Sequence, residues 1–289
     1  VPENFTVEFL ADYEQIIDRE GNIYKPLTGR TISGVYKVTK DDGTHAESAE
    51  FTVEVGGQYA DEGENAKPAV IPELAEWHGA SGTFAVSETS RIVIAEDAAD
   101  IAADAAEALQ ADYADDSGIT LEIVNGGTPQ AGDFYFTKDT ASMLDEEGYT
   151  MAIDDYVTIG AEEAAGAYWS TRSILQILEQ NDDTMPMGVT RDYPKYEVRG
   201  FMLDVARTPY RLQQLQDYTK VMLWYKMNEY HLHINDNDNC NITGSVEDHS
   251  GFHRLESDVF PSLESEVKHA GIPEELVNAD YYLHNEDYQ

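Results

Sequence analysis

Two apolar runs with one helical pattern between them constrain the fold of this chain more than any other feature. The runs are 195–206 (KYEVRGFMLDVA) and 229–235 (EYHLHIN), and each suits a strand that is covered on both faces. Apolar residues between them recur at steps of three to four, as on one face of a helix: Leu212, Leu215, Tyr218, Met222 and Tyr225. Strand, helix, strand is the repeating unit of a parallel α/β fold, which we expect here.

Polar residues follow both predicted strands. Asp204 and Arg207 come at the end of the first run, and Asp236 and Asp238 come directly after the second. Because the carboxyl ends of parallel strands meet at one edge of a sheet, polar residues there are the expected site-formers. We therefore predict a functional site at this edge.

The first 56 residues read as a small antiparallel β-sandwich module. Apolar and polar residues alternate in short runs at 6–10, 34–38 and 51–55, and turn signals occur at Gly21-Asn22 and Asp42-Gly43. Residues 57–68 (GGQYADEGENAK) lose this periodicity and become glycine-rich and acidic, which predicts a linker.

Residues 69–194 indicate an α+β domain, because short strand patterns now alternate with helical ones. Strands are predicted at 91–94, 119–124 and 133–136, and a hairpin is predicted over 149–160 with its turn at Asp154-Asp155. One helix is expected to carry its apolar face from Ala98 to Leu109, and another to run over about 161–180.

Charge excludes several classes of partner. The chain carries 56 acidic and 18 basic residues, a formal net charge of −38, which repels nucleic acid and anionic membranes. A neutral or cationic ligand such as a glycan meets no such repulsion. No stretch reaches the roughly 18 apolar residues that span a bilayer.

The single cysteine, Cys240, rules out an intramolecular disulfide and a cysteine-rich metal site, and we interpret it as a small buried residue. The chain starts at Val1 instead of with a methionine-led basic and apolar signal segment, so we expect the N-terminus to have been processed or trimmed.

Three segments carry a resemblance to a known family. YEVRGFMLDVAR, LWYKMN and YHLHINDND, in this order and spacing, resemble the opening of the catalytic barrel in glycoside hydrolase family 20, the β-N-acetylhexosaminidase and lacto-N-biosidase family. The helix pattern AGAYWSTRSILQIL resembles the end of the α+β domain that precedes that barrel. The resemblance covers about residues 69–260.

The resemblance implies that residues 195–289 are the opening strands of a (β/α)8 TIM barrel. They are too few to complete one, because such a barrel needs about 250 residues. We therefore expect a multidomain chain with a β-sandwich module, an α+β domain of the hexosaminidase type and an incomplete barrel.

Arg207 closes the LDVAR motif and matches the arginine that, in the family, binds hydroxyls of the terminal N-acetylhexosamine. A guanidinium suits this task because its fork of fixed donors can hold two adjacent hydroxyls. Without the motif, an ion pair with Asp236 would be an equal alternative. For Arg199 and Asp204 we favour a structural ion pair inside the barrel wall over direct contact with substrate.

Asp236 matches an aspartate that tunes the family's general acid through a histidine. A carboxylate behind an imidazole selects one tautomer and favours the protonated ring. We place His233, Asp204 and Asp238 beside it as supporting residues. Family members commonly carry a second acidic residue directly after this aspartate, whereas this chain has Asn237, so the charge of the site is left open.

The residues disfavour two possible metal sites. Residues 236–247 place acidic side chains as a calcium loop does, but the sixth position is Asn241 instead of glycine, and a strand precedes the loop. His231 and His233 share one face of a strand, yet no third zinc ligand has suitable spacing. We predict no metal and no cofactor.

The loop after the second strand contains RLES at 254–257, which resembles a stretch in lacto-N-biosidase-like members. Two interpretations stay open: the loop forms further sugar subsites, or it is a solvated surface loop. Residues 261–289 are acidic and tyrosine-rich and read as an insertion.

The expected parent is a secreted or cell-surface bacterial glycosidase whose partners are a glycan with a terminal N-acetylhexosamine and the remainder of its own chain. The resemblance implies substrate-assisted, retaining hydrolysis by an Asp-Glu pair expected after Gln289. Release of lacto-N-biose, or non-catalytic glycan binding or adhesion, are the alternatives. The residues do not choose between GlcNAc, GalNAc and lacto-N-biose.

We predict that these 289 residues alone hydrolyse no aryl-N-acetylglucosaminide, because the expected acid lies outside them. Release of the aryl group by the purified chain is the measurement, and turnover above that of buffer would contradict the prediction.

Overall fold

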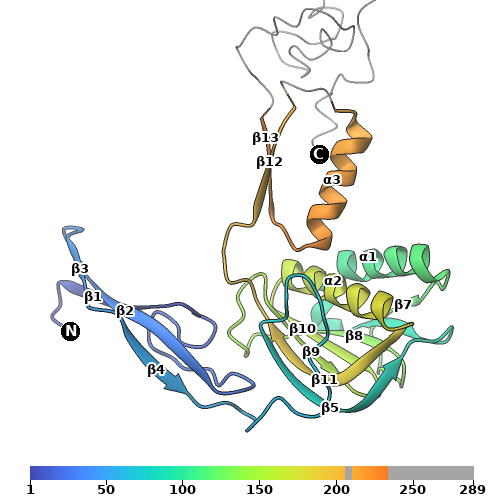
Figure 1. Cartoon of the computed structure of the whole chain (residues 1–289), viewed down its shortest axis with the longest axis horizontal. Helices are drawn as coiled ribbons and strands as arrows, with labels where there is room; N and C mark the ends of the chain where they lie inside the picture. Colours follow the sequence, from blue (N-terminus) through green and yellow to red (C-terminus); the bar gives the residue numbers. More distant parts are fainter. Residues whose placement is uncertain (206–209, 234–289) are drawn as a thin grey trace, which may run out of the picture. The chain divides into compact units, whose positions relative to one another are not determined.

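The computed structural model describes residues 1–205 and 210–233 (Figure 1). The chain divides into two compact units, Val1–Glu197 and Val198–Gln289. The first unit holds a β-module followed by an α+β domain, and the described part of the second holds two strands and a helix. In the described ranges, every helix is too short or too polar to cross a membrane.

The β-module is one antiparallel sheet of four strands. They are β1 (Phe5–Ala11), β2 (Arg30–Lys40), β3 (His45–Glu47) and β4 (Phe51–Val55), and β2 pairs with each of the other three. The strands predicted at 6–10, 34–38 and 51–55 are confirmed. The short β3 was not predicted, because its three residues are all exposed and show no alternation.

The prediction of a β-sandwich was wrong for this module, because no second sheet faces the first within residues 1–55. The apolar face of Phe9 and Ile32 is covered instead by Ile16 and Ile17, which come from the loop between β1 and β2. Alternation in a strand predicts one buried face, but it does not distinguish cover by a sheet from cover by a loop.

The aperiodic segment after the β-module runs along an edge of the next sheet. The backbone amide of Gly79 donates to Glu62, and the carbonyl of Gly79 accepts from Glu64. The two chains approach so closely that a Cβ on Gly79 would lie 2.0 Å from the carbonyl oxygen of Asn65. The segment therefore covers an edge strand that would otherwise present unpaired backbone groups.

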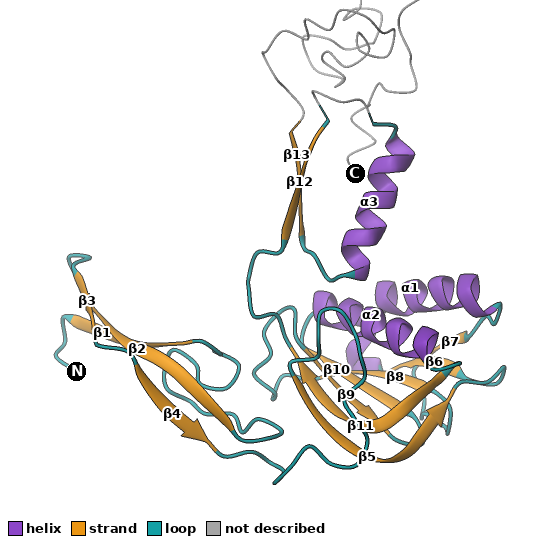
Figure 2. Cartoon of the chain, viewed as in Figure 1, coloured by secondary structure: helices purple, strands orange, loops and turns teal. Residues whose placement is uncertain are grey.

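The α+β domain is a mixed seven-stranded sheet with its helices on one face (Figure 2). The sheet order is β5-β11-β9-β10-β8-β6-β7. The strands are β5 (Glu76–Ala85), β6 (Arg91–Ile94), β7 (Glu122–Asn125), β8 (Phe134–Lys138), β9 (Tyr149–Ile153), β10 (Val157–Ala161) and β11 (Thr184–Asp192). The helices are the short η1 (Glu96–Ala98), α1 (Ala99–Ser117) and α2 (Ala164–Gln180).

Most of this domain's elements were predicted. The strand at 91–94 is confirmed, the hairpin forms from β9 and β10, and both helices are present. Strands β5 and β11 were missed, because Pro186 and several glycines interrupt their alternation. Those residues have a role in pairing: the register shifts between Pro186 and Gly188, and a Cβ on Gly188 would lie 2.6 Å from the Trp77 ring.

The second unit contains β12 (Gly200–Asp204), α3 (Leu212–Trp224) and β13 (Glu229–His233). The two strands pair in parallel, and α3 lies between them in the chain. Leu203 and Val205 form a small core with Leu215 of α3. The predicted strand, helix, strand unit is confirmed, whereas its continuation into a barrel stays a prediction.

Close packing at Gly166 in α2 generates a prediction. A Cβ at this position would lie 2.1 Å from the carbonyl oxygen of Gly148, so Gly166→Ala must displace backbone. We expect the free energy of unfolding in urea to fall by about 2 kcal/mol, although alanine is the better helix former. Gly56→Ala is the control, because nothing lies within 4 Å of its Cβ, and equal stability of the two variants would contradict the prediction.

Candidate functional site

Two of the predicted site residues meet at the carboxyl ends of the paired strands in the second unit. Asp204 ends β12 and His233 ends β13, and the two are direct partners in the parallel register. The backbone amide of Val205 donates to the carbonyl of His233 at 3.0 Å, which extends the pairing by one residue. Both side chains are half-buried.

The two faces of this strand pair differ in character. Leu203 and Leu232 belong to the apolar face, where Leu203 packs with Leu215 of α3. Since side chains alternate along a strand, Asp204 and His233 lie on the opposite face. That polar face is the one on which a site can be built.

Arg199 precedes β12 and holds the loop that leads into β13. Its Nε donates to the carbonyl of Lys226 at 2.8 Å, and its backbone amide donates to the side chain of Asn228 at 2.9 Å. The pairing of Arg199 with Asp204 inside a barrel wall stays a prediction.

Several predicted features lie outside the described residues. These are Arg207, Asp236, Asp238 and Cys240, together with the loops at 236–247 and 249–258. The described residues contain no group of three or more histidine, cysteine, aspartate or glutamate side chains arranged to hold a metal ion. His231 is exposed on β13.

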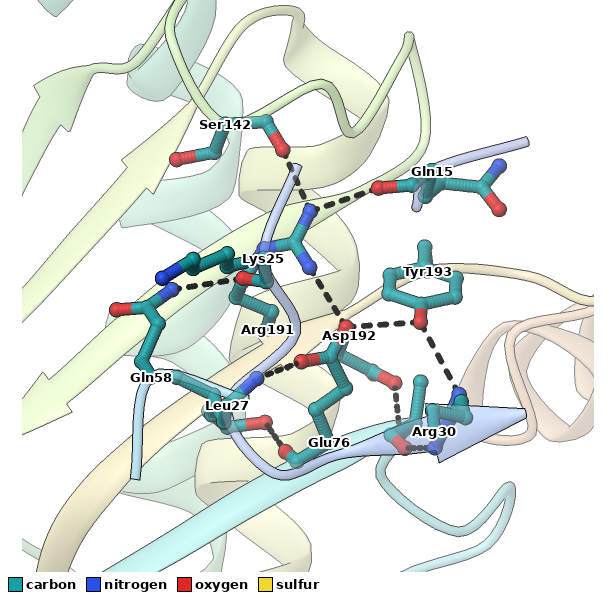
Figure 3. Close-up of polar contacts among 12 residues, drawn as sticks. Gln15, Lys25, Leu27, Arg30, Gln58, Glu76, Ser142, Arg191, Asp192 and Tyr193 are labelled. Carbon is teal, nitrogen blue, oxygen red and sulfur yellow. Dashed lines mark hydrogen bonds and ion pairs between the residues drawn. The ribbon is translucent and has the colours of Figure 1, made fainter. Parts of the chain in front are cut away.

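A buried ion pair in the first unit was not predicted. Arg191 of β11 and Glu76 of β5 are each 3% exposed, and Nη1 lies 2.6 Å from Oε1 (Figure 3). The Nη2 group of Arg191 donates to the carbonyls of Ser142 at 2.7 Å and Gln15 at 3.1 Å. No local spacing links these residues in the sequence, so only the pairing of β5 with β11 brings them together.

Glu76 also accepts hydrogen bonds from the β-module and from the residue that follows β11. The backbone amide of Leu27 donates to Oε2 at 2.6 Å, and the hydroxyl of Tyr193 donates to Oε1 at 2.8 Å. Arg30 of the β-module donates in turn to the Tyr193 hydroxyl at 3.2 Å. Burial and the charge of Glu76 raise the pKa of Tyr193, so the phenol stays protonated and remains a donor.

A second buried contact continues this network into the sheet. Asp192 accepts from the backbone amide of Ala75 at 2.9 Å and from the hydroxyl of Tyr149 at 2.8 Å. Burial and the nearby Asp192 carboxylate raise the pKa of Tyr149. Most polar groups of this network have partners, although the buried Nε of Arg191 has none among the described residues, and the mutual pairing of the others is typical of a structural junction.

An acidic cleft of about 780 Å³ opens beside this junction. The β-module contributes Asp12 and Glu14, and the α+β domain contributes the loop 145–147 with Glu162 and Glu163. Some of these carboxylates are already paired: Glu14 binds Arg19, and Glu147 accepts from the indole of Trp169 at 3.1 Å. The cleft is unfavourable for anions, and its carboxylates come from segments too distant in sequence for a motif to show.

Two models of one family match the chain in succession. The model of "Glycosyl hydrolase family 20, domain 2" matches residues 67–193, and that of "Glycosyl hydrolase family 20, catalytic domain" matches residues 196–246. A β-hexosaminidase of Porphyromonas gingivalis is 30% identical over 178 residues, which are 58% of this chain and 22% of that protein. A lacto-N-biosidase of Bifidobacterium bifidum is 28% identical over 141 residues, which are 47% of this chain and 12% of that protein.

A solved structure shows the same fold. The β-N-acetylhexosaminidase of Streptomyces coelicolor superposes with a TM-score of 0.57 and 22% identity, over 77% of this chain and 44% of that one. The chain therefore spans about a fifth or less of the length of the two curated relatives and under half of this structure.

The buried ion pair generates a prediction on stability. Arg191→Met leaves the Glu76 carboxylate buried without its cation, so we expect the free energy of unfolding to fall by about 3–5 kcal/mol. Arg19→Met is the matched control, because Arg19 pairs with Glu14 on the surface, where such pairs contribute about 1 kcal/mol or less. Urea unfolding measures both, and equal losses in the two variants would refute a buried, energetically coupled pair.

Proposed function

Because the chain belongs to glycosyl hydrolase family 20, we propose that it is part of a glycosidase that removes terminal N-acetylhexosamine from glycans. The observation that carries this proposal is the adjacent match of two models of that family, domain 2 and then the catalytic domain, along residues 67–246. The names of the relatives, β-hexosaminidase and lacto-N-biosidase, support the same class of reaction.

The second unit is, in this proposal, the opening of a (β/α)8 barrel. The parallel pairing of β12 with β13 supports it, as does the apolar contact of Leu203 with α3 on one face. Barrel strands are covered outside by helices and carry their functional residues at their carboxyl ends. Asp204 and His233 stand at that end.

The proposed roles follow from residue chemistry. Arg207 donates to two adjacent hydroxyls of the terminal sugar, because its guanidinium offers parallel donors. Asp236, supported by His233, Asp204 and Asp238, sets the protonation of a histidine beside the general acid. The net charge of −38 does not oppose binding of an uncharged glycan.

The proposed reaction is substrate-assisted and retaining. The 2-acetamido oxygen attacks the anomeric carbon while a glutamic acid protonates the departing glycosidic oxygen, and water then opens the cyclic intermediate. The preceding aspartate orients the acetamido group. This Asp-Glu pair is expected outside these 289 residues, so in this proposal Arg207 and its supporting residues bind and orient the sugar instead of cleaving it.

Release of a disaccharide is the second candidate. The similarity to a lacto-N-biosidase favours it, and RLES at 254–257 is the segment that would shape the additional subsite. A glycan-binding or adhesion module without catalysis is a third. For each candidate we propose a secreted or cell-surface location in a bacterium, which is consistent with the bacterial sources of the relatives.

A substrate panel distinguishes these candidates. The longer protein is given the aryl β-glycosides of GlcNAc, GalNAc and lacto-N-biose, and release of the aryl group is followed. Turnover of GlcNAc or GalNAc glycosides supports a hexosaminidase, and turnover of the lacto-N-biose glycoside alone supports a lacto-N-biosidase. Binding of glycans without any turnover would overturn the proposal of an enzyme.

Arg207→Met tests the sugar-binding role in the same protein. Loss of two hydrogen bonds from a charged donor is expected to lower kcat/KM about 100-fold. Lys220→Gln is the matched control, because it removes one positive charge from an exposed position on α3. A variant at Arg207 with the kcat/KM of the control would exclude the residue from the sugar site.

A further inference from the structure

The segment that leads from the α+β domain to the second unit begins buried and ends exposed. Tyr193 is 6% exposed directly after β11, whereas Tyr196 is 67% exposed. We call residues 193–197 the connector. Its buried start means that something holds it in place before the chain enters β12.

Arg30 of the β-module fixes the start of the connector. Nη1 of Arg30 donates to the hydroxyl of Tyr193 at 3.2 Å, and Nη2 donates to the carbonyl of Ala75 at 2.6 Å. Ala75 directly precedes β5, and Tyr193 directly follows β11. One guanidinium at the start of β2 therefore binds the chain both where it enters the domain's sheet and where it leaves.

Tyr13 of the β-module adds contacts along the connector. Its ring meets the Tyr193 ring edge-on, with centroids 6.3 Å apart and an angle of 76°. The Arg30 guanidinium lies 4.8 Å from the centroid of the Tyr13 ring, and the Lys195 ammonium lies 5.5 Å from the same Tyr13 centroid. Cation–π contacts of this kind stabilise a packed arrangement without any ligand.

We propose that the β-module is a clamp on the connector, which fixes the point from which the second unit leaves the α+β domain. The buried pair of Glu76 and Arg191 stabilises this arrangement, because Glu76 accepts hydrogen bonds both from Leu27 of the β-module and from Tyr193 of the connector. The clamp is a property of the first unit and does not depend on the proposed glycosidase function.

Trypsin cleavage of the 289-residue chain tests the clamp, because the bond between Lys195 and Tyr196 lies in the exposed part of the connector. Arg30→Gln and Tyr193→Phe each remove the hydrogen bond between Arg30 and Tyr193, and the second keeps the ring. Cleavage tracks local opening, so we expect this bond to be cut about tenfold faster in both variants. Mass spectrometry identifies the cleaved bond.

Arg19→Gln is the matched control, because Arg19 lies in the same module but pairs with Glu14. Its connector should be cut at the wild-type rate. Unchanged cleavage in Arg30→Gln and Tyr193→Phe would overturn the clamp. An equal increase at the bond between Lys37 and Val38 of β2 would also overturn it, because that result means unfolding of the module instead of release of the connector.

Discussion

The buried pair of Arg191 and Glu76 is the interaction on which the first unit depends. A charge that is 3% exposed is strongly unfavourable alone, so each partner needs the other together with further hydrogen bonds. Those bonds come from the β-module and from the connector: Leu27 and Tyr193 donate to Glu76, and Gln15 accepts from Arg191. Burial of this one ion pair therefore requires contacts between segments that the sequence presents as separate modules.

The second unit depends on a different constraint. Parallel strands need a crossover, and a helix that packs on one face of the pair leaves the other face for polar residues. Leu203 and Leu215 form the contact between the strand pair and the crossover helix α3. Asp204 and His233 lie on the opposite face of the pair. The same alternation thus accounts for the small core and for the position of two residues to which we assign supporting roles in the proposed site.

Periodicity predicted the elements whose apolar faces are continuous. The helices α1, α2 and α3 and the hairpin of β9 and β10 belong to this class. Strands β5 and β11 do not, since Gly79, Pro186 and Gly188 interrupt them. Neighbouring segments require glycine at two of these positions: a Cβ on Gly79 would meet the carbonyl oxygen of Asn65, and a Cβ on Gly188 would meet the Trp77 ring of β5. Alternation also predicted a sandwich for the β-module, because it does not show whether a sheet or a loop covers the apolar face.

The sequence alone determined the order of the units, the strand, helix, strand pattern and the family motifs, because these depend on residues close together in the chain. It also placed Asp204 at the carboxyl edge of the parallel strands and named His233 as a supporting residue, whereas their direct pairing came from the structure. Tertiary structure decided the rest of the first unit: the partners of Glu76, the acidic cleft and the attachment of the β-module through Arg30. Those contacts join residues far apart in the chain, and pairing of this kind has no periodicity from which it could be predicted.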